Sequence, residues 1–246
     1  IKIQDYADLK DADVVITAFG DIQASVRTGN RFAEFEINSK NAVEVGRKLK
    51  EAGFNGVLIN ISNPCDAITT ILQQETGLPR NRVFGTGTFL DTARMQHVVG
   101  DYLHQDSRNI DGYVLGEHGN SQFNAWSTVR ANNKPITEIL SQAELEALDS
   151  KPSEGAWTVA SGKGYTSYAI ATCGVRLAQA VMSNAKLFAP ASVYVEALGT
   201  YIGYPAIIGA EGAEEVVELK LNAKEEEQLA RSVQYIKDHV AQLGKD

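Results

Sequence analysis

One histidine stands where acid–base chemistry is expected. His118 lies between Gly116 and Gly119, directly after the apolar run 113–115, which is typical of a short strand. Flanking glycines let a backbone or a ligand approach closely and leave the imidazole accessible. Because α/β folds place working residues at the carboxyl ends of their strands, His118 is a candidate for proton transfer. A surface or satisfied core histidine is the alternative, and we read the other three histidines that way.

Asp91 and Arg94 lie three residues apart in a predicted helix over 90–103, so they share one helix face. A buried aspartate can orient an imidazole and stabilise its protonated form. An arginine presents a planar fork that binds a carboxylate through two parallel hydrogen bonds. The alternative for the two residues is an ordinary surface ion pair at this spacing.

Two loops carry further polar candidates. Asn63 precedes Pro64 at a predicted strand end, where cis peptides occur and where an amide can hydrogen-bond a ligand. Turn chemistry is the alternative for Asn63. Arg31 ends a polar loop that contains Gly29, and a loop of this kind can bring an arginine over a pocket and exclude water. A solvated loop arginine is the alternative.

The composition narrows the class of protein. The 246 residues include 23 Lys and Arg against 31 Asp and Glu, a net charge of −8, which disfavours a nucleic-acid partner. No apolar run approaches the roughly 18 residues of a membrane span, and the first residues lack the pattern of a secretory signal. Two cysteines outside any Cys-x-x-Cys motif favour a reducing, cytoplasmic location.

The candidates sit on an alternation of predicted elements. Strands are expected near 13–18, 56–61 and 82–85, with helices ending near 52, over 66–76 and over 90–103. This order is typical of parallel strands joined by crossover helices. The second half is predicted to hold a hairpin around 126–134, helical residues 143–186, strands near 192–198 and 216–221 with a Gly-rich turn between them, and a last helix starting at Asn222. We therefore expect a parallel α/β half followed by an α+β half.

Four strings in a fixed order carry a resemblance to a known family. They are residues 61–66 (ISNPCD), 85–94 (GTGTFLDTAR), 116–121 (GEHGNS) and 163–167 (KGYTS). Together they resemble the NAD-dependent lactate/malate dehydrogenase family over nearly the whole chain. Within that family, the chain looks most like the L-2-hydroxyisocaproate and L-lactate dehydrogenases of lactic acid bacteria.

The resemblance implies an NAD-dependent L-2-hydroxy acid dehydrogenase. It implies an incomplete Rossmann-like parallel sheet in a partial NAD-binding domain over 1–86, and an α+β catalytic domain over 87–246. The implied partners are NAD, a small 2-keto or 2-hydroxy acid, and further copies of the chain in a homodimer or homotetramer. No metal ligand is implied.

The resemblance also implies roles for the catalytic candidates. His118 matches the residue that donates and accepts the proton, and Asp91 matches the carboxylate that orients it. Arg94 matches the arginine that binds the substrate carboxylate. Arg31 matches the lid-loop arginine that polarises the carbonyl. A cationic histidine and an arginine suit an oxygen that gains negative charge during hydride transfer.

Four pocket positions follow from the same resemblance. Asn63 matches a residue that contacts both substrate and nicotinamide ribose. Thr166 is assigned to the substrate pocket, and Ile170 and Gly20 are assigned to the cofactor. The protein's contribution in such a site is orientation and electric field, because the cofactor supplies the hydride.

The family's opening strand, G-x-G-x-x-G turn and following acidic residue are absent from this sequence. We therefore expect a fragment or a wrongly assigned start, which on its own neither binds NAD tightly nor folds well. Six positions before Arg31, where lactate enzymes carry Gln and malate enzymes carry Arg, stands Ser25, with Val26 beside it. This favours a broad 2-keto acid specificity, while Arg27 keeps malate dehydrogenase open as an alternative. A catalytically dead, truncated family member is the other alternative.

Overall fold

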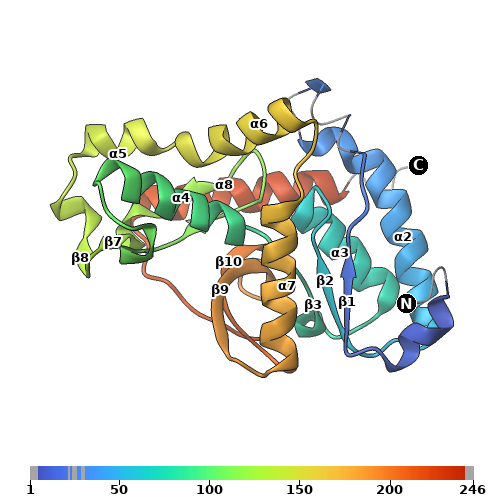
Figure 1. The fold of residues 1–246 in the computed structure, drawn as a ribbon. Coiled ribbons are helices and arrows are strands. Elements are labelled where there is room, and N and C mark those ends of the chain that lie inside the picture. The colour runs from blue at the N-terminus through green and yellow to red at the C-terminus, as the bar shows by residue number, and fades with distance from the viewer. Residues whose placement is uncertain (1–4, 22, 24–26, 29–30, 242–246) are drawn as a thin grey trace.

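A six-stranded mixed sheet forms the centre of the molecule, with helices packed against both faces (Figure 1). The structure, a computed structural model, describes residues 5–21, 23, 27–28 and 31–241, without the side chains of residues 31, 32 and 156. Within this described part of the chain, no helix combines the length and the apolar character that a bilayer span requires.

The strand order of the central sheet is β1-β2-β3-β9-β10-β11. The strands are β1 (Val14–Thr17), β2 (Val57–Asn60), β3 (Val83–Gly85), β9 (Leu187–Val195), β10 (Thr200–Gly209) and β11 (Gly212–Val216). The first three strands are parallel, and the last three add in antiparallel order. The predicted parallel half followed by a mixed half is therefore confirmed. The sheet contains strands from both sides of the expected domain division at residues 86 and 87, and that division stays a prediction.

The helices begin and end where local capping chemistry allows. They are α2 (Phe35–Ala52), α3 (Cys65–Thr76), α4 (Phe89–Tyr102), α5 (Gln142–Leu148), α6 (Lys151–Lys163), α7 (Tyr168–Met182) and α8 (Ala223–Val240). The first two helices end, as expected, near residues 52 and 76, where Gly53 and Gly77 adopt left-handed φ angles of 78° and 69°. The last helix starts after Asn222, as predicted, and Asn222 and Glu225 form a capping box there.

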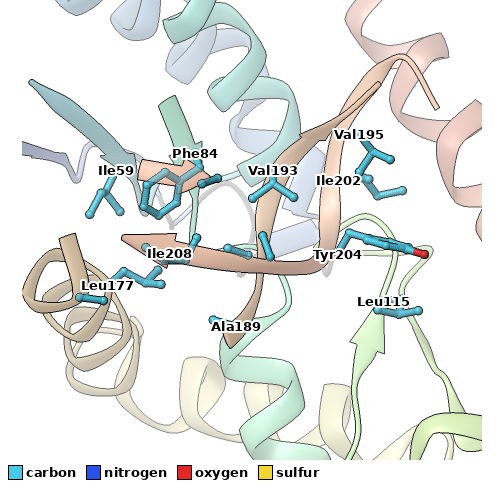
Figure 2. Packing of buried hydrophobic residues seen from close by; sticks show 14 of the residues in the cluster. Ile59, Phe84, Leu115, Leu177, Ala189, Val193, Val195, Ile202, Tyr204 and Ile208 are labelled. Carbon is cyan, nitrogen blue, oxygen red and sulfur yellow. The ribbon is translucent and has the colours of Figure 1, made fainter. Parts of the chain in front are cut away.

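Alternating side chains of β2 pack against helices on opposite faces of the sheet. Leu58 belongs to a buried cluster with Ile68 and Leu72 of α3. Ile59 belongs to a second cluster with Leu177 of α7, and Figure 2 shows Phe84 and Ile208 in the same cluster. Because both faces are covered, the strand is apolar at every position up to Asn60.

Two small sheets complete the second half and hold the histidine loop. The first consists of β4 (Ile110–Asp111), β7 (Arg130–Ala131) and β8 (Lys134–Pro135), and the second of β5 (Val114–Leu115) and β6 (Phe123–Asn124). The loop 116–121 therefore connects β5 to β6. Gly116 forms a bridge to Gly203 of β10, so the loop begins on the central sheet.

Three sequence expectations in the second half were wrong. The Gly-rich turn expected after residue 198 is largely the ten-residue strand β10. Its Gly203 and Pro205 resemble turn residues, but a Cβ at Gly203 would lie 2.6 Å from Thr88 and 2.7 Å from the Gly116 carbonyl oxygen. The glycine there serves close packing. Residues 126–128, expected to belong to the hairpin, form a 3₁₀ turn, and the hairpin itself is β7–β8. The strand expected near 216–221 lies earlier in the chain, as β11 over Gly212–Val216.

Gly85→Ala tests how tightly β3 packs on α3. A Cβ at Gly85 would lie 2.6 Å from Cys65 Sγ and 2.7 Å from Thr69 Oγ1, so we expect a loss of about 1–3 kcal/mol in the free energy of unfolding. Gly155→Ala in α6 is the control, because its Cβ would meet nothing within 4 Å. That variant should gain about 0.5–1 kcal/mol from helix propensity. Urea unfolding measures both, and an unchanged Gly85→Ala variant would contradict this packing.

Candidate active site

A cavity of about 440 Å³ opens at the carboxyl ends of the parallel strands. Six of the eight residues predicted from the sequence line it: Gly20, Asn63, Arg94, His118, Thr166 and Ile170. The structure therefore brings together residues from five separate segments of the chain. Asp91 lies directly behind this wall, bonded to His118.

Asp91 and His118 form a buried pair. Asp91 is completely buried in the first turn of α4, and His118 is 7% exposed. Asp91 Oδ2 lies 2.6 Å from His118 Nδ1. A carboxylate this close to Nδ1 fixes the orientation of the ring. The contact has the geometry that the sequence analysis expected of an orienting aspartate.

Arg94 contacts the other oxygen of the same carboxylate. Its Nη1 donates to Asp91 Oδ1 at 3.0 Å, and its side chain is 20% exposed where it lines the cavity. The two residues do form an i, i+3 ion pair, but it is not the surface pair that was the alternative. Because Asp91 accepts only part of the guanidinium fork, Arg94 can also present donors to an anion in the cavity.

The backbone of His118 is held by a second buried carboxylate, which the sequence analysis did not identify. The His118 N–H donates to Asp66 Oδ2 at 2.8 Å, and Ser192 Oγ of β9 donates to Asp66 Oδ1 at 2.5 Å. Asp66 is 1% exposed. Burial raises the pKa of Asp66 to about 7, although the Ser192 hydroxyl opposes the shift, and the nearby Glu117 charge adds to it.

Asn63 is positioned through its backbone. The peptide bond to Pro64 is cis, and the Asn63 carbonyl oxygen accepts a hydrogen bond from Asn38 Nδ2 of α2 at 2.6 Å. Asn38 is fully buried. The link leaves the Asn63 side chain on the cavity wall, where its amide can meet a ligand.

The cavity fits the nicotinamide end of a dinucleotide. Residues 18–20, which follow β1, line one side of the cavity. A Cβ at Gly20 would lie 2.9 Å from Glu34 Oε2, so the glycine backbone itself forms the surface there. Asn63 offers amide hydrogen bonds beside this strip, and Ile170 contributes an apolar surface from α7. A flat ring with a carboxamide needs this combination of apolar and polar contacts.

Several cavity residues were missed by sequence reasoning. Trp157 and Ala160 lie one turn apart on α6, and Tyr165 lies next to Thr166 in the KGYTS string. Tyr165 had a signal, because its neighbour was already a candidate. Trp157 had none, since only the fold brings α6 over the strand ends. Among the described residues, no group of three or more His, Cys, Asp or Glu side chains is arranged to hold a metal ion.

The lid residues are placed only in part. Arg31 begins a 3₁₀ turn over Arg31–Glu34, but its side chain lies outside the description, so its role stays a prediction. Ser25 and Val26 also lie outside the described residues, while Arg27 is exposed.

Two family models match the chain in sequence. The model for the lactate/malate dehydrogenase NAD binding domain matches residues 1–85, and the model for the lactate/malate dehydrogenase alpha/beta C-terminal domain matches residues 88–245. The L-lactate dehydrogenase 1 of Listeria monocytogenes is 36% identical over 239 residues, which cover 94% of this chain and 76% of that protein.

Solved structures agree with these matches. A lactate dehydrogenase from a Medee basin deep-sea metagenome library aligns with a TM-score of 0.89 at 35% identity, covering 96% of this chain and 78% of that one. The malate dehydrogenase of Aeropyrum pernix aligns with a TM-score of 0.87 at 26% identity, covering 97% and 78%. The chain belongs to the lactate/malate dehydrogenase family. It is an NAD-dependent 2-hydroxy acid dehydrogenase of the L-lactate type.

Asp66→Asn should flatten the pH dependence of stability. The folded chain keeps the Asp66 proton up to about pH 7, whereas the unfolded chain releases it near pH 4, so folding binds a proton in this window. The contribution of Asp66 to stability therefore falls as the pH rises from about 4 to about 7. Asparagine can still accept from His118 and donate to Ser192, but it does not titrate. Urea unfolding across this range should show a smaller slope for Asp66→Asn than for an Asp101→Asn control. Equal slopes would contradict the assignment.

Proposed function

We propose that the chain interconverts 2-keto acids with apolar side chains, such as 2-ketoisocaproate or pyruvate, and the corresponding L-2-hydroxy acids, with His118 as the acid and base. The observation that carries this proposal is the buried contact of 2.6 Å between Asp91 and His118 at the wall of the cavity. It supplies an oriented proton donor where a carbonyl oxygen can bind.

The proton moves at the ring nitrogen that Asp91 does not occupy. Asp91 takes Nδ1, so His118 donates from Nε2 to the ketone oxygen during reduction and recovers the proton there during oxidation. Asp91 stays ionised and stabilises the imidazolium. Because both groups are buried, their interaction is screened less than on the surface.

The other candidates bind and orient. Arg94 grips the substrate carboxylate with the donors that Asp91 leaves available. Arg31 is assigned to polarising the carbonyl from the lid loop. Gly20, Asn63 and Ile170 would hold the nicotinamide end of NAD, and Thr166 would contact the substrate. When bound, NAD supplies or accepts the hydride.

The cavity favours an apolar substrate side chain. Arg94 is the only lysine or arginine among the described residues that line it, so these residues offer no second cation to a second substrate carboxylate. Glu34 lines the same cavity and would repel such a group. Trp157, Ala160 and Ile170 offer apolar surface instead. Malate dehydrogenase stays an alternative because Arg27 belongs to the lid segment, and because the chain also resembles the Aeropyrum pernix enzyme.

Homo-oligomer formation and a cytoplasmic location belong to this proposal. Large apolar side chains are exposed on three helices: Ile37 of α2, Val159 of α6, and Tyr168 and Val175 of α7. A homodimer or homotetramer would cover such surfaces. Cys65 and Cys173 are buried free thiols, which suits a reducing compartment.

NADH oxidation followed at 340 nm tests the proposal with 2-ketoisocaproate, pyruvate and oxaloacetate assayed in parallel. We expect turnover with the first two acids and a lower kcat/KM for oxaloacetate. Arg94→Lys should lower kcat/KM for every acid by about 10-fold or more, because an ammonium cannot replace the bidentate fork. Preference for oxaloacetate would favour the malate alternative. No NADH oxidation with any of the three acids would favour the catalytically dead, truncated alternative.

A further inference from the structure

We propose that Ser232 of the C-terminal helix α8 is a positioning residue for catalysis, because it closes a ring of hydrogen bonds that holds the loop carrying His118. The inference rests on the proposed function of His118. The ring joins three residues, Glu117, Ser121 and Ser232, of which the last is more than 100 positions away in the sequence.

Glu117 is a buried carboxylate directly before His118. It is 1% exposed, and its Oε2 accepts three hydrogen bonds: from the Asn120 N–H at 2.8 Å, the Ser121 N–H at 2.8 Å and Ser121 Oγ at 2.9 Å. The side chain of Glu117 therefore folds the loop back on itself around His118.

Ser232 connects this carboxylate to α8. It is fully buried, its Oγ accepts from the Glu117 N–H at 2.6 Å, and it lies 2.9 Å from Ser121 Oγ. A serine hydroxyl has one proton. Since Ser121 donates its proton to Glu117, Ser232 must donate to Ser121, which gives every bond in the ring one direction.

Because the three hydrogen bonds all run the same way around the ring, the ring is closed and its bonds are cooperative. The Glu117 N–H donates to Ser232, Ser232 donates to Ser121, and Ser121 donates back to the Glu117 carboxylate. Bonds arranged head to tail polarise one another, and removing one member leaves buried partners unsatisfied.

The glycines on either side of His118 are explained by this ring. A Cβ at Gly119 would lie 1.9 Å from Glu117 Oε1, so only glycine admits the buried carboxylate. A Cβ at Gly116 would lie 2.8 Å from Ser232 Oγ, and Gly116 has a φ of +98°. The sequence analysis read these glycines as giving access to the imidazole. The structure shows that they make room for Glu117 and Ser232.

The ring and Asp66 together fix the backbone of the loop. The N–H groups of Glu117, His118, Asn120 and Ser121 all donate to buried acceptors. α8 supplies a rigid support, because its Ile236 is buried in the main apolar cluster. Small displacements of a catalytic group slow a reaction strongly, so support from α8 should appear in kcat.

Ser232→Ala tests this role, with Val233→Ala as a matched control on the neighbouring buried position of α8. We expect Ser232→Ala to lower kcat by about 10-fold or more, while KM for the keto acid changes by less than about threefold because Arg94 is untouched. Val233→Ala should lower the melting temperature and leave kcat within about twofold. Ser121→Ala should resemble Ser232→Ala, and the double variant should cost less than the two single losses combined.

Amide hydrogen exchange tests the ring independently of turnover. Residues 116–121 should lose protection in Ser232→Ala and keep it in Val233→Ala. If Ser232→Ala matches Val233→Ala in kcat and in exchange, the inference is overturned. If the unchanged chain reduces no keto acid, the proposed function fails, and exchange at 116–121 still shows whether the ring exists.

Discussion

The bond between Asp91 and His118 is the constraint on which the rest of the site depends. Two ionisable groups are buried against each other, and the cost of burying them is recovered only if they stay in contact. The first turn of α4 must therefore lie next to the loop 116–121, and this loop must keep a fixed position relative to the central sheet. Arg94, one turn further along α4, is placed by the same helix.

The central sheet brings the other residues of the site next to the Asp91–His118 pair. The carboxyl ends of β1, β2 and β3 contribute Gly20, Asn63 and the start of α4, and the bridge between Gly116 and Gly203 ties the histidine loop to β10. Thr166 of the α6–α7 connection and Ile170 of α7 complete the cavity lining. Segments that are far apart in the sequence meet because parallel strands present all their carboxyl ends at one edge.

Buried carboxylates surround the histidine from three directions. Asp91 meets the ring, Asp66 meets the His118 N–H, and Glu117 holds the residues that follow. Specific donors hold Asp66 and Glu117, so the contacts around the His118 loop are in place before any substrate binds. Such preorganisation reduces the reorganisation that the reaction requires.

Much of the site was predictable because its residues lie in short strings with strong local signals. His118 between glycines, the spacing of Asp91 and Arg94, and the helix-ending glycines all follow from neighbours in sequence. The missed features depend on distant contacts. Gly203 marks close packing inside β10 and not a turn, Trp157 reaches the cavity only through the placement of α6, and Ser232 meets Glu117 across 115 positions.

The most direct test of the account is the kcat for 2-keto acid reduction by Asp91→Asn, measured beside Asp101→Asn, an exposed aspartate further along α4. Asparagine keeps the size of the side chain but removes the charge that stabilises the protonated ring. The account predicts that kcat falls by about 100-fold or more in Asp91→Asn and is unchanged in Asp101→Asn. Equal activity of the two variants would contradict the assignment of the buried aspartate–histidine pair as the centre of catalysis.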